Sequence, residues 1–179
     1  MNAQLLDKQE DSAKFLFKGI NPVIANTIRR LVVNEVPVMA IETVEFVKNN
    51  SALYDETIAH RLGLIPLSTD LKSYNLPSEC KCEGKGCQNC QLKLVLKVKG
   101  PCTVYSSELK SQDPKVKPVF DKMPIVLLLK DQELVLEATA VLGKGNDHTK
   151  FSPGLVSYMG YPELGKKQNS AIKEFVDKC

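Results

Sequence analysis

The amino-acid sequence predicts an α+β fold, and three observations lead to this fold class. Two segments with helical patterns lie in the first third of the chain, and several short segments rich in β-branched residues follow them. The two types do not alternate regularly, as the βαβ units of a doubly wound parallel sheet would. A chain of 179 residues is long enough for one or two domains with a buried core.

The first predicted helix covers residues 21–35. Asn21 suits the N-cap, and Pro22 suits the first helical position because that position needs no N–H donor. Pro37 favours an end to the helix shortly before it. At helical spacing, the apolar residues form one stripe that consists of Ile24, Ile28, Leu31 and Val32. A second face carries Asn26, Arg29 and Arg30.

A second helix is predicted over residues 53–62, with Gly63 placed to cap its end. Strands are predicted before each helix, where β-branched and apolar residues alternate with polar ones, at residues 14–20 and 38–48. Further strands are predicted at residues 92–99, 103–105, 125–130, 133–142 and 155–161. Turn-rich stretches separate these later runs, at residues 111–117 and 143–149.

Four cysteines stand within eleven positions of the polar segment 68–91, in the pattern C-x-C-x4-C-x2-C. They are Cys80, Cys82, Cys87 and Cys90, and they define a predicted metal loop at residues 78–91. Two close pairs with a glycine-containing connection can bring four sulfurs to the corners of a tetrahedron, about 2.3 Å from a zinc ion. Four thiolates leave zinc no open coordination position, so the predicted site is structural.

Other interpretations of the cysteines stay open. Four thiolates can also hold an iron–sulfur cluster, although the usual spacings for clusters differ from this one. Reactive or paired thiols are less favoured, because no thioredoxin-like βαβ unit surrounds the C-x2-C pair. Cys102 is predicted to be a packed strand residue and not a fifth ligand.

The composition favours a cytoplasmic globular protein. The formal net charge is +3, from 24 Lys and Arg against 21 Asp and Glu, which is too balanced to indicate nucleic-acid binding by itself. No apolar run reaches the roughly 18 residues of a membrane helix, and the first residues do not resemble a secretory signal. Clustered cysteines without an export signal indicate a reducing compartment.

Three stretches of the chain together resemble the α-like subunits of RNA polymerase. Residues 21–46 read NPVIANTIRRLVVNEVPVMAIETVEF and resemble the helix-and-strand signature of that family. Residues 54–67 read YDETIAHRLGLIPL, and residues 133–162 read ELVLEATAVLGKGNDHTKFSPGLVSYMGYP; both resemble segments of its archaeal and eukaryotic members. The resemblance covers the chain from about Lys14 to Leu164.

The resemblance implies a dimerisation domain that a mostly β inserted domain interrupts. The first part of the dimerisation domain would cover residues 1–48, the inserted domain with its metal loop would cover 49–149, and a return to the dimerisation domain would cover 150–179. In this family that return continues with a further strand and a long helix, which residues 150–179 do not match. A fragment, a split gene and a naturally shorter subunit are all compatible with this departure.

The resemblance also implies an assembly role without catalytic residues. Members pair with a small α-like subunit, called subunit L, and the pair recruits the large subunits, which carry the nucleotidyltransferase chemistry and meet the DNA. Part of the apolar stripe on residues 21–35 would then be covered by the partner. The face with Asn26, Arg29 and Arg30 would contact the large subunits, where arginine can pair with carboxylates.

A protein of another class is the alternative. A free-standing zinc-binding module for nucleic acid would use the lysines beside the cysteine loop, Lys81, Lys85 and Lys93. No interleaved aromatic residues accompany these lysines, which disfavours this hypothesis.

Overall fold

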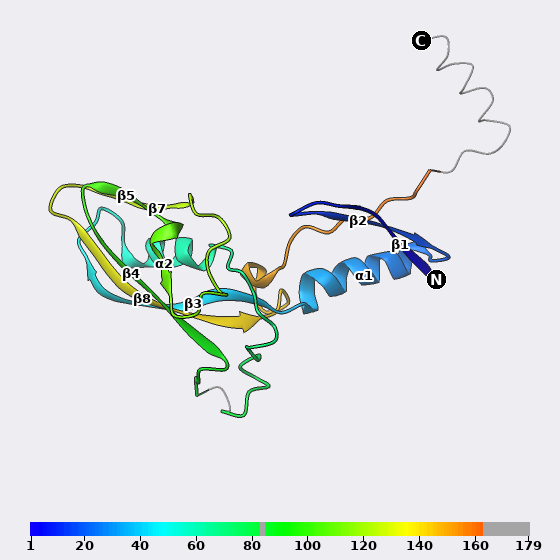
Figure 1. Cartoon of the computed structure of the whole chain (residues 1–179), viewed down its shortest axis with the longest axis horizontal. Helices are drawn as coiled ribbons and strands as arrows, with labels where there is room; N and C mark the ends of the chain where they lie inside the picture. Colours follow the sequence, from blue (N-terminus) through cyan, green and yellow to red (C-terminus); the bar gives the residue numbers. More distant parts are fainter. Residues whose placement is uncertain (83–84, 163–179) are drawn as a thin grey trace, which may run out of the picture. The chain divides into compact units, whose positions relative to one another are not determined.

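The computed structural model describes residues 1–82 and 85–162 (Figure 1). The described residues form two compact units, one with Met1–Arg29 and residues 156–162, and one with Arg30–Leu155. Within the described residues, no helix is both long and apolar enough to span a membrane.

The first unit begins with an antiparallel hairpin of strands β1 (Asn2–Lys8) and β2 (Ala13–Lys18). The turn between them is closed by the Gln9 N–H, which donates to the Ser12 carbonyl at 2.8 Å. β2 confirms the strand predicted at residues 14–20. β1 was not predicted, because its apolar residues are few and its pairing depends on β2.

Helix α1 (Pro22–Glu35) follows the hairpin and confirms the first predicted helix. The Ile24 N–H donates to Oδ1 of Asn21 at 2.9 Å, so Asn21 is the N-cap that the sequence predicts.

The second unit is built on a four-stranded antiparallel sheet with the order β3-β8-β4-β6. Its strands are β3 (Val38–Asn49), β8 (Glu133–Gly143), β4 (Gln91–Lys99) and β6 (Lys110–Ser111). A separate pair contains β5 (Cys102–Tyr105) and β7 (Pro124–Leu128). β3, β4, β5, β7 and β8 confirm five of the predicted strands, whereas the short β6 was not predicted.

The core of the second unit lies on one face of this sheet. Every second residue of β8 from Leu134 to Leu142 is buried, because successive side chains of a strand point to opposite faces of the sheet. Ile58 and Leu62 of helix α2 (Asp55–Gly63) and residues of the β5–β7 pair complete the core. The Arg61 guanidinium also donates to the Ile125 carbonyl at 2.7 Å, which ties α2 to β7.

One predicted strand is wrong. Residues 155–161 adopt no regular secondary structure, and Leu155 and Met159 are fully or largely exposed. A strand is stable when a neighbouring strand pairs with its backbone groups, and none of the described strands pairs with this segment.

The predicted domain boundaries at residues 48 and 149 stay a prediction. β3 pairs with β8 along almost its whole length, from Val38 to Asn49. Residues 38–48 therefore share a sheet with the segment that was predicted to be the inserted domain.

Candidate functional site

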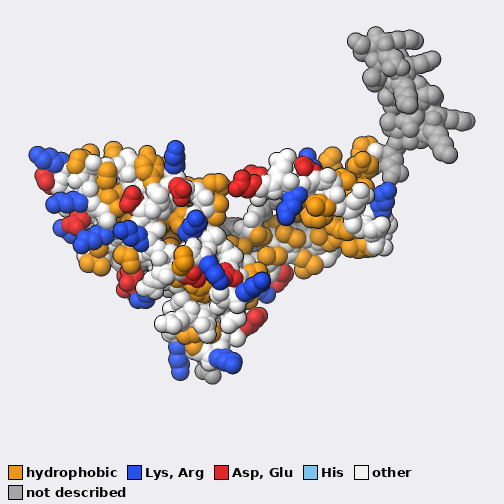
Figure 2. Space-filling model, in the orientation of Figure 1, with side chains coloured by type: hydrophobic (Ala, Val, Ile, Leu, Met, Phe, Trp, Pro, Cys, Tyr) orange, Lys and Arg blue, Asp and Glu red, His pale blue; other side chains and the backbone are white. Residues whose placement is uncertain are grey.

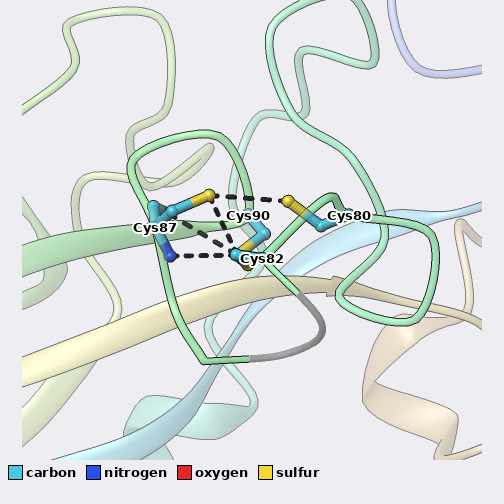
Figure 3. A group of neighbouring side chains, drawn as sticks. All are labelled: Cys80, Cys82, Cys87 and Cys90. Carbon is cyan, nitrogen blue, oxygen red and sulfur yellow. Dashed lines mark hydrogen bonds between the residues drawn. The ribbon is translucent and has the colours of Figure 1, made fainter.

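The four cysteines lie in an irregular loop between α2 and β4 (Figure 3). Cys90 directly precedes Gln91, the first residue of β4, so the sheet holds one end of the loop. Cys80 and Cys90 are 8% and 1% exposed, whereas Cys82 and Cys87 are half-buried. Each sequence pair, Cys80 with Cys82 and Cys87 with Cys90, therefore has one buried (inner) cysteine and one half-buried (outer) cysteine.

The four sulfur atoms converge on one point. All of them lie within 4.8 Å of one another. The Sγ–Sγ distance is 3.5 Å for Cys80–Cys87 and for Cys82–Cys90, and 3.7 Å for Cys87–Cys90. Four sulfurs about 2.3 Å from a central zinc ion would stand about 3.8 Å apart. The described sulfurs thus fit a single tetrahedral metal ion.

The backbone of the loop turns tightly around the sulfurs. The N–H of Cys87 donates to Sγ of Cys90 at 3.2 Å, and the N–H of Cys90 donates to the Cys87 carbonyl at 3.0 Å. Gly86 has φ +83°, a left-handed conformation that side chains with a Cβ rarely adopt. This glycine has the role that the sequence predicts for it.

The thiols of Cys82 and Cys90 have pKa values shifted in opposite directions. Sulfur contacts with Cys80 and then Cys90 lower the pKa of Cys82 to about 6, whereas burial raises the pKa of Cys90 to about 12. Four thiols this close cannot all ionise unaided, because each negative charge disfavours the next. A bound divalent cation would stabilise all four as thiolates.

The second candidate site is the exposed surface of α1. Among the described residues, none covers α1 enough to bury any of its side chains. Ile24 and Leu31 are 42% and 52% exposed, and Ile28 and Val32 are half-buried. Figure 2 shows hydrophobic side chains gathered over the part of the molecule that holds α1 and the β1–β2 hairpin.

The polar face of α1 is partly ordered by an internal contact. Nε of Arg29 donates to Oδ1 of Asn26 at 3.0 Å, and both residues are half-buried. Arg30 is exposed, and no ion pair is formed by either arginine within the described residues.

One group of residues near the cysteines was missed from the sequence. The Tyr74 hydroxyl donates to the carboxylate of Asp113, and the Asn75 N–H donates to the carbonyl of Asn89 in the cysteine loop. No local spacing could reveal them, because their partners lie far along the chain.

Comparison with known proteins identifies the second unit. A family model described as "RNA polymerase Rpb3/RpoA insert domain" matches residues 39–155. This match places the unit in the class of RNA polymerase insert domains.

Curated relatives extend the likeness to the whole chain. The chain is 43% identical to DNA-directed RNA polymerase subunit Rpo3 of Methanosphaera stadtmanae, over 100% of this chain and 69% of the relative. It is 42% identical to the Rpo3 of Archaeoglobus fulgidus, over 98% of this chain and 67% of the relative, and 46% identical to that of Methanosarcina acetivorans, over 100% and 68%. The chain spans about two thirds of the length of these relatives. It belongs to the Rpo3 family of DNA-directed RNA polymerase subunits.

Proposed function

We propose that this chain is the archaeal α-like subunit of DNA-directed RNA polymerase, a non-catalytic assembly protein that acts in the cytoplasm. The observation that carries the proposal is α1, a 14-residue amphipathic helix without a buried side chain among the described residues. An exposed apolar stripe of this kind is typical of a surface that a partner covers. Because the chain belongs to the Rpo3 family, the proposed partner is another subunit of RNA polymerase.

The apolar stripe is the proposed surface for the small α-like subunit L. Ile24 and Leu31 are the most exposed residues of this stripe, and Ile28 and Val32 are half-buried beside them. The neighbouring face with Asn26, Arg29 and Arg30 is the proposed contact for the large subunits. Its guanidinium groups can form bidentate hydrogen bonds with carboxylates.

Co-expression with subunit L, followed by size-exclusion chromatography in native salt, tests this proposal. We expect the two chains to elute together in a 1:1 complex. Elution of each chain at the volume of its own free form would contradict the pairing.

The metal at the four cysteines is proposed to be a structural zinc ion. An all-sulfur set is typical of structural zinc, and two of the four cysteines, Cys80 and Cys90, are buried. When bound, zinc would cross-link the loop and supply no catalytic chemistry. Elemental analysis should give about one zinc ion per chain, and Cys82→Ser should lower this ratio. A ratio near zero in the parent protein would contradict the zinc site.

The nucleic-acid-binding alternative is not favoured. Of the lysines that suggested it, Lys93 forms an ion pair with Glu137 on β8, and this pair neutralises part of the positive charge next to the loop. The family and the exposed helix both indicate a protein partner.

A further inference from the structure

The segment that leads into the cysteine loop, residues 68–75, is attached to a distant turn at residues 113–118. The Ser68 N–H donates to the Lys117 carbonyl at 2.9 Å, and the Ser68 hydroxyl donates to the Lys115 carbonyl at 2.7 Å. An isolated bridge between Leu67 and Pro118 continues this pairing into the core.

An ion pair adds a second attachment. Nζ of Lys115 lies 3.0 Å from Oδ2 of Asp70. The Lys115 ammonium, the Ser73 hydroxyl and the Lys72 N–H together hold the pKa of the Asp70 carboxyl well below its usual range. Asp70 therefore stays ionised, and this contact persists at neutral pH.

Tyr74 supplies the third attachment and is the most buried of these side chains. It is 7% exposed and belongs to the hydrophobic core of the second unit. Its hydroxyl donates to Oδ2 of Asp113 at 2.9 Å. The other carboxylate oxygen of Asp113 accepts from the Lys115 N–H at 2.9 Å, so the acceptor is held in place. Burial, and then the Asp113 carboxylate, raise the pKa of Tyr74 to about 12, so its hydroxyl remains a donor.

The residue after Tyr74 connects this network to the cysteines. The Asn75 N–H donates to the Asn89 carbonyl at 2.8 Å, and Asn89 directly precedes Cys90. Asn75 and Asn89 also line the surface hollow that contains Cys80, Cys82 and Cys87. The segment before the cysteine loop is thus joined to the end of the loop by a hydrogen bond that involves no metal ligand.

We propose that Tyr74 is a positioning residue for the metal site: its hydrogen bond to Asp113 anchors the segment before the cysteine loop, and the neighbouring Asn75–Asn89 bond joins this anchored segment to the end of the loop. The proposal rests on the zinc site proposed above. With these two bonds formed, Cys80 and Cys90 stay close to each other, and only the outer pair has to close around the ion. A loop released from Asp113 opens more often, and a metal ion leaves through such local openings.

The rate of zinc transfer to an excess of a coloured chelator tests this proposal on the full chain. Loss of a buried hydrogen bond to a charged group should raise the release rate of Tyr74→Phe on the order of tenfold. The matched control is Tyr54→Phe, because Tyr54 is exposed and its carbonyl, which bonds the first turn of α2, is unchanged. Its release rate should equal that of the parent protein.

A second variant, Asp113→Ala, tests whether the hydrogen bond itself is responsible, because it removes the carboxylate oxygens that accept from the Tyr74 hydroxyl and the Lys115 N–H. In the double variant, the loss of the Tyr74 hydroxyl should add nothing to the release rate of Asp113→Ala, because that hydroxyl then has no acceptor. A double variant that is faster than Asp113→Ala by the full factor of Tyr74→Phe would overturn the role of the Tyr74–Asp113 bond. If Tyr74→Phe does not fold by circular dichroism, Asp113→Ala alone decides, and a release rate equal to the parent's would overturn the proposal.

The outcomes separate this proposal from the zinc site. A parent protein without bound zinc contradicts the site, and the positioning role fails with it. A parent that holds zinc, with Tyr74→Phe releasing it at the parental rate, leaves the site intact and overturns the positioning role. A lower urea midpoint of metal-free Tyr74→Phe, with unchanged release from the loaded protein, would show a merely structural role and would also overturn it.

Discussion

The backbone N–H of Asn146 donates a 3.1 Å hydrogen bond to the carbonyl of Asn34, so the turn after β8 caps the last turn of α1. The last carbonyls of a helix have no partner within the helix, and this contact satisfies one of them. Nζ of Lys144 lies 3.1 Å from the Glu35 carboxylate and adds an ion pair at the same place. The last turn of α1, which belongs to the second unit, is therefore held by the turn after β8 within the same unit.

Gly145→Ala should destabilise the protein. A Cβ on Gly145 would lie 2.1 Å from the Val33 carbonyl oxygen, so the turn or the helix end must move. We expect a loss of about 1–3 kcal/mol in the free energy of unfolding, measured by urea denaturation. Gly154→Ala is the control, because a Cβ there meets no atom within 4 Å. Equal stability of the two variants would contradict the close packing of the turn.

Ser106→Ala should also be destabilising, for a different reason. Ser106 is fully buried, and its hydroxyl donates to the Phe120 carbonyl and accepts from the Met123 N–H. Its removal leaves both backbone groups without this partner, at a cost of about 1–3 kcal/mol by urea denaturation. The neighbouring Ser107 is exposed, and Ser107→Ala should change the unfolding free energy little. A Ser106→Ala protein as stable as the Ser107→Ala protein would refute this role.

Tyr74 should ionise above the usual pH range of a tyrosine. Its pKa of about 12 predicts that one of the five tyrosines titrates well above pH 10 in absorbance at 295 nm. Because the folded-state pKa is raised from 10.0, the stability from this group is complete below pH 10 and is lost as the pH rises toward 12. Tyr74→Phe should remove the late step. A titration with the same late step in Tyr74→Phe would assign it to another residue.

Local signals explain which parts of the fold could be predicted. Asn21 and Pro22 mark the start of α1 because capping depends only on adjacent residues. The composition of residues 133–142 predicted the strand that the structure shows as β8. The spacing of the four cysteines predicted a convergence that the sulfur positions confirm.

Non-local contacts explain what the sequence could not reveal. Residues 155–161 have a strand-like composition, but composition cannot say whether a neighbouring strand is available. The Tyr74–Asp113 bond joins residues 39 positions apart, and the turn at Asn146 meets α1 more than one hundred positions earlier. Such contacts depend on the assembled fold and leave no periodic pattern in the sequence.

We propose that α1, and not the cysteine loop, carries the assembly function. Adjacent substitutions separate the two proposed faces of α1, because successive helical residues point about 100° apart. Leu31→Glu places a charge in the apolar stripe, whereas Arg30→Glu changes the neighbouring polar face. Cys82→Ser alters the metal loop alone.

Co-elution of each variant with subunit L on size exclusion is the most direct measurement. The parent protein, Arg30→Glu and Cys82→Ser should elute with subunit L, and Leu31→Glu should not, provided that circular dichroism shows it folded. Pairing that survives Leu31→Glu but is lost in Cys82→Ser would contradict the account.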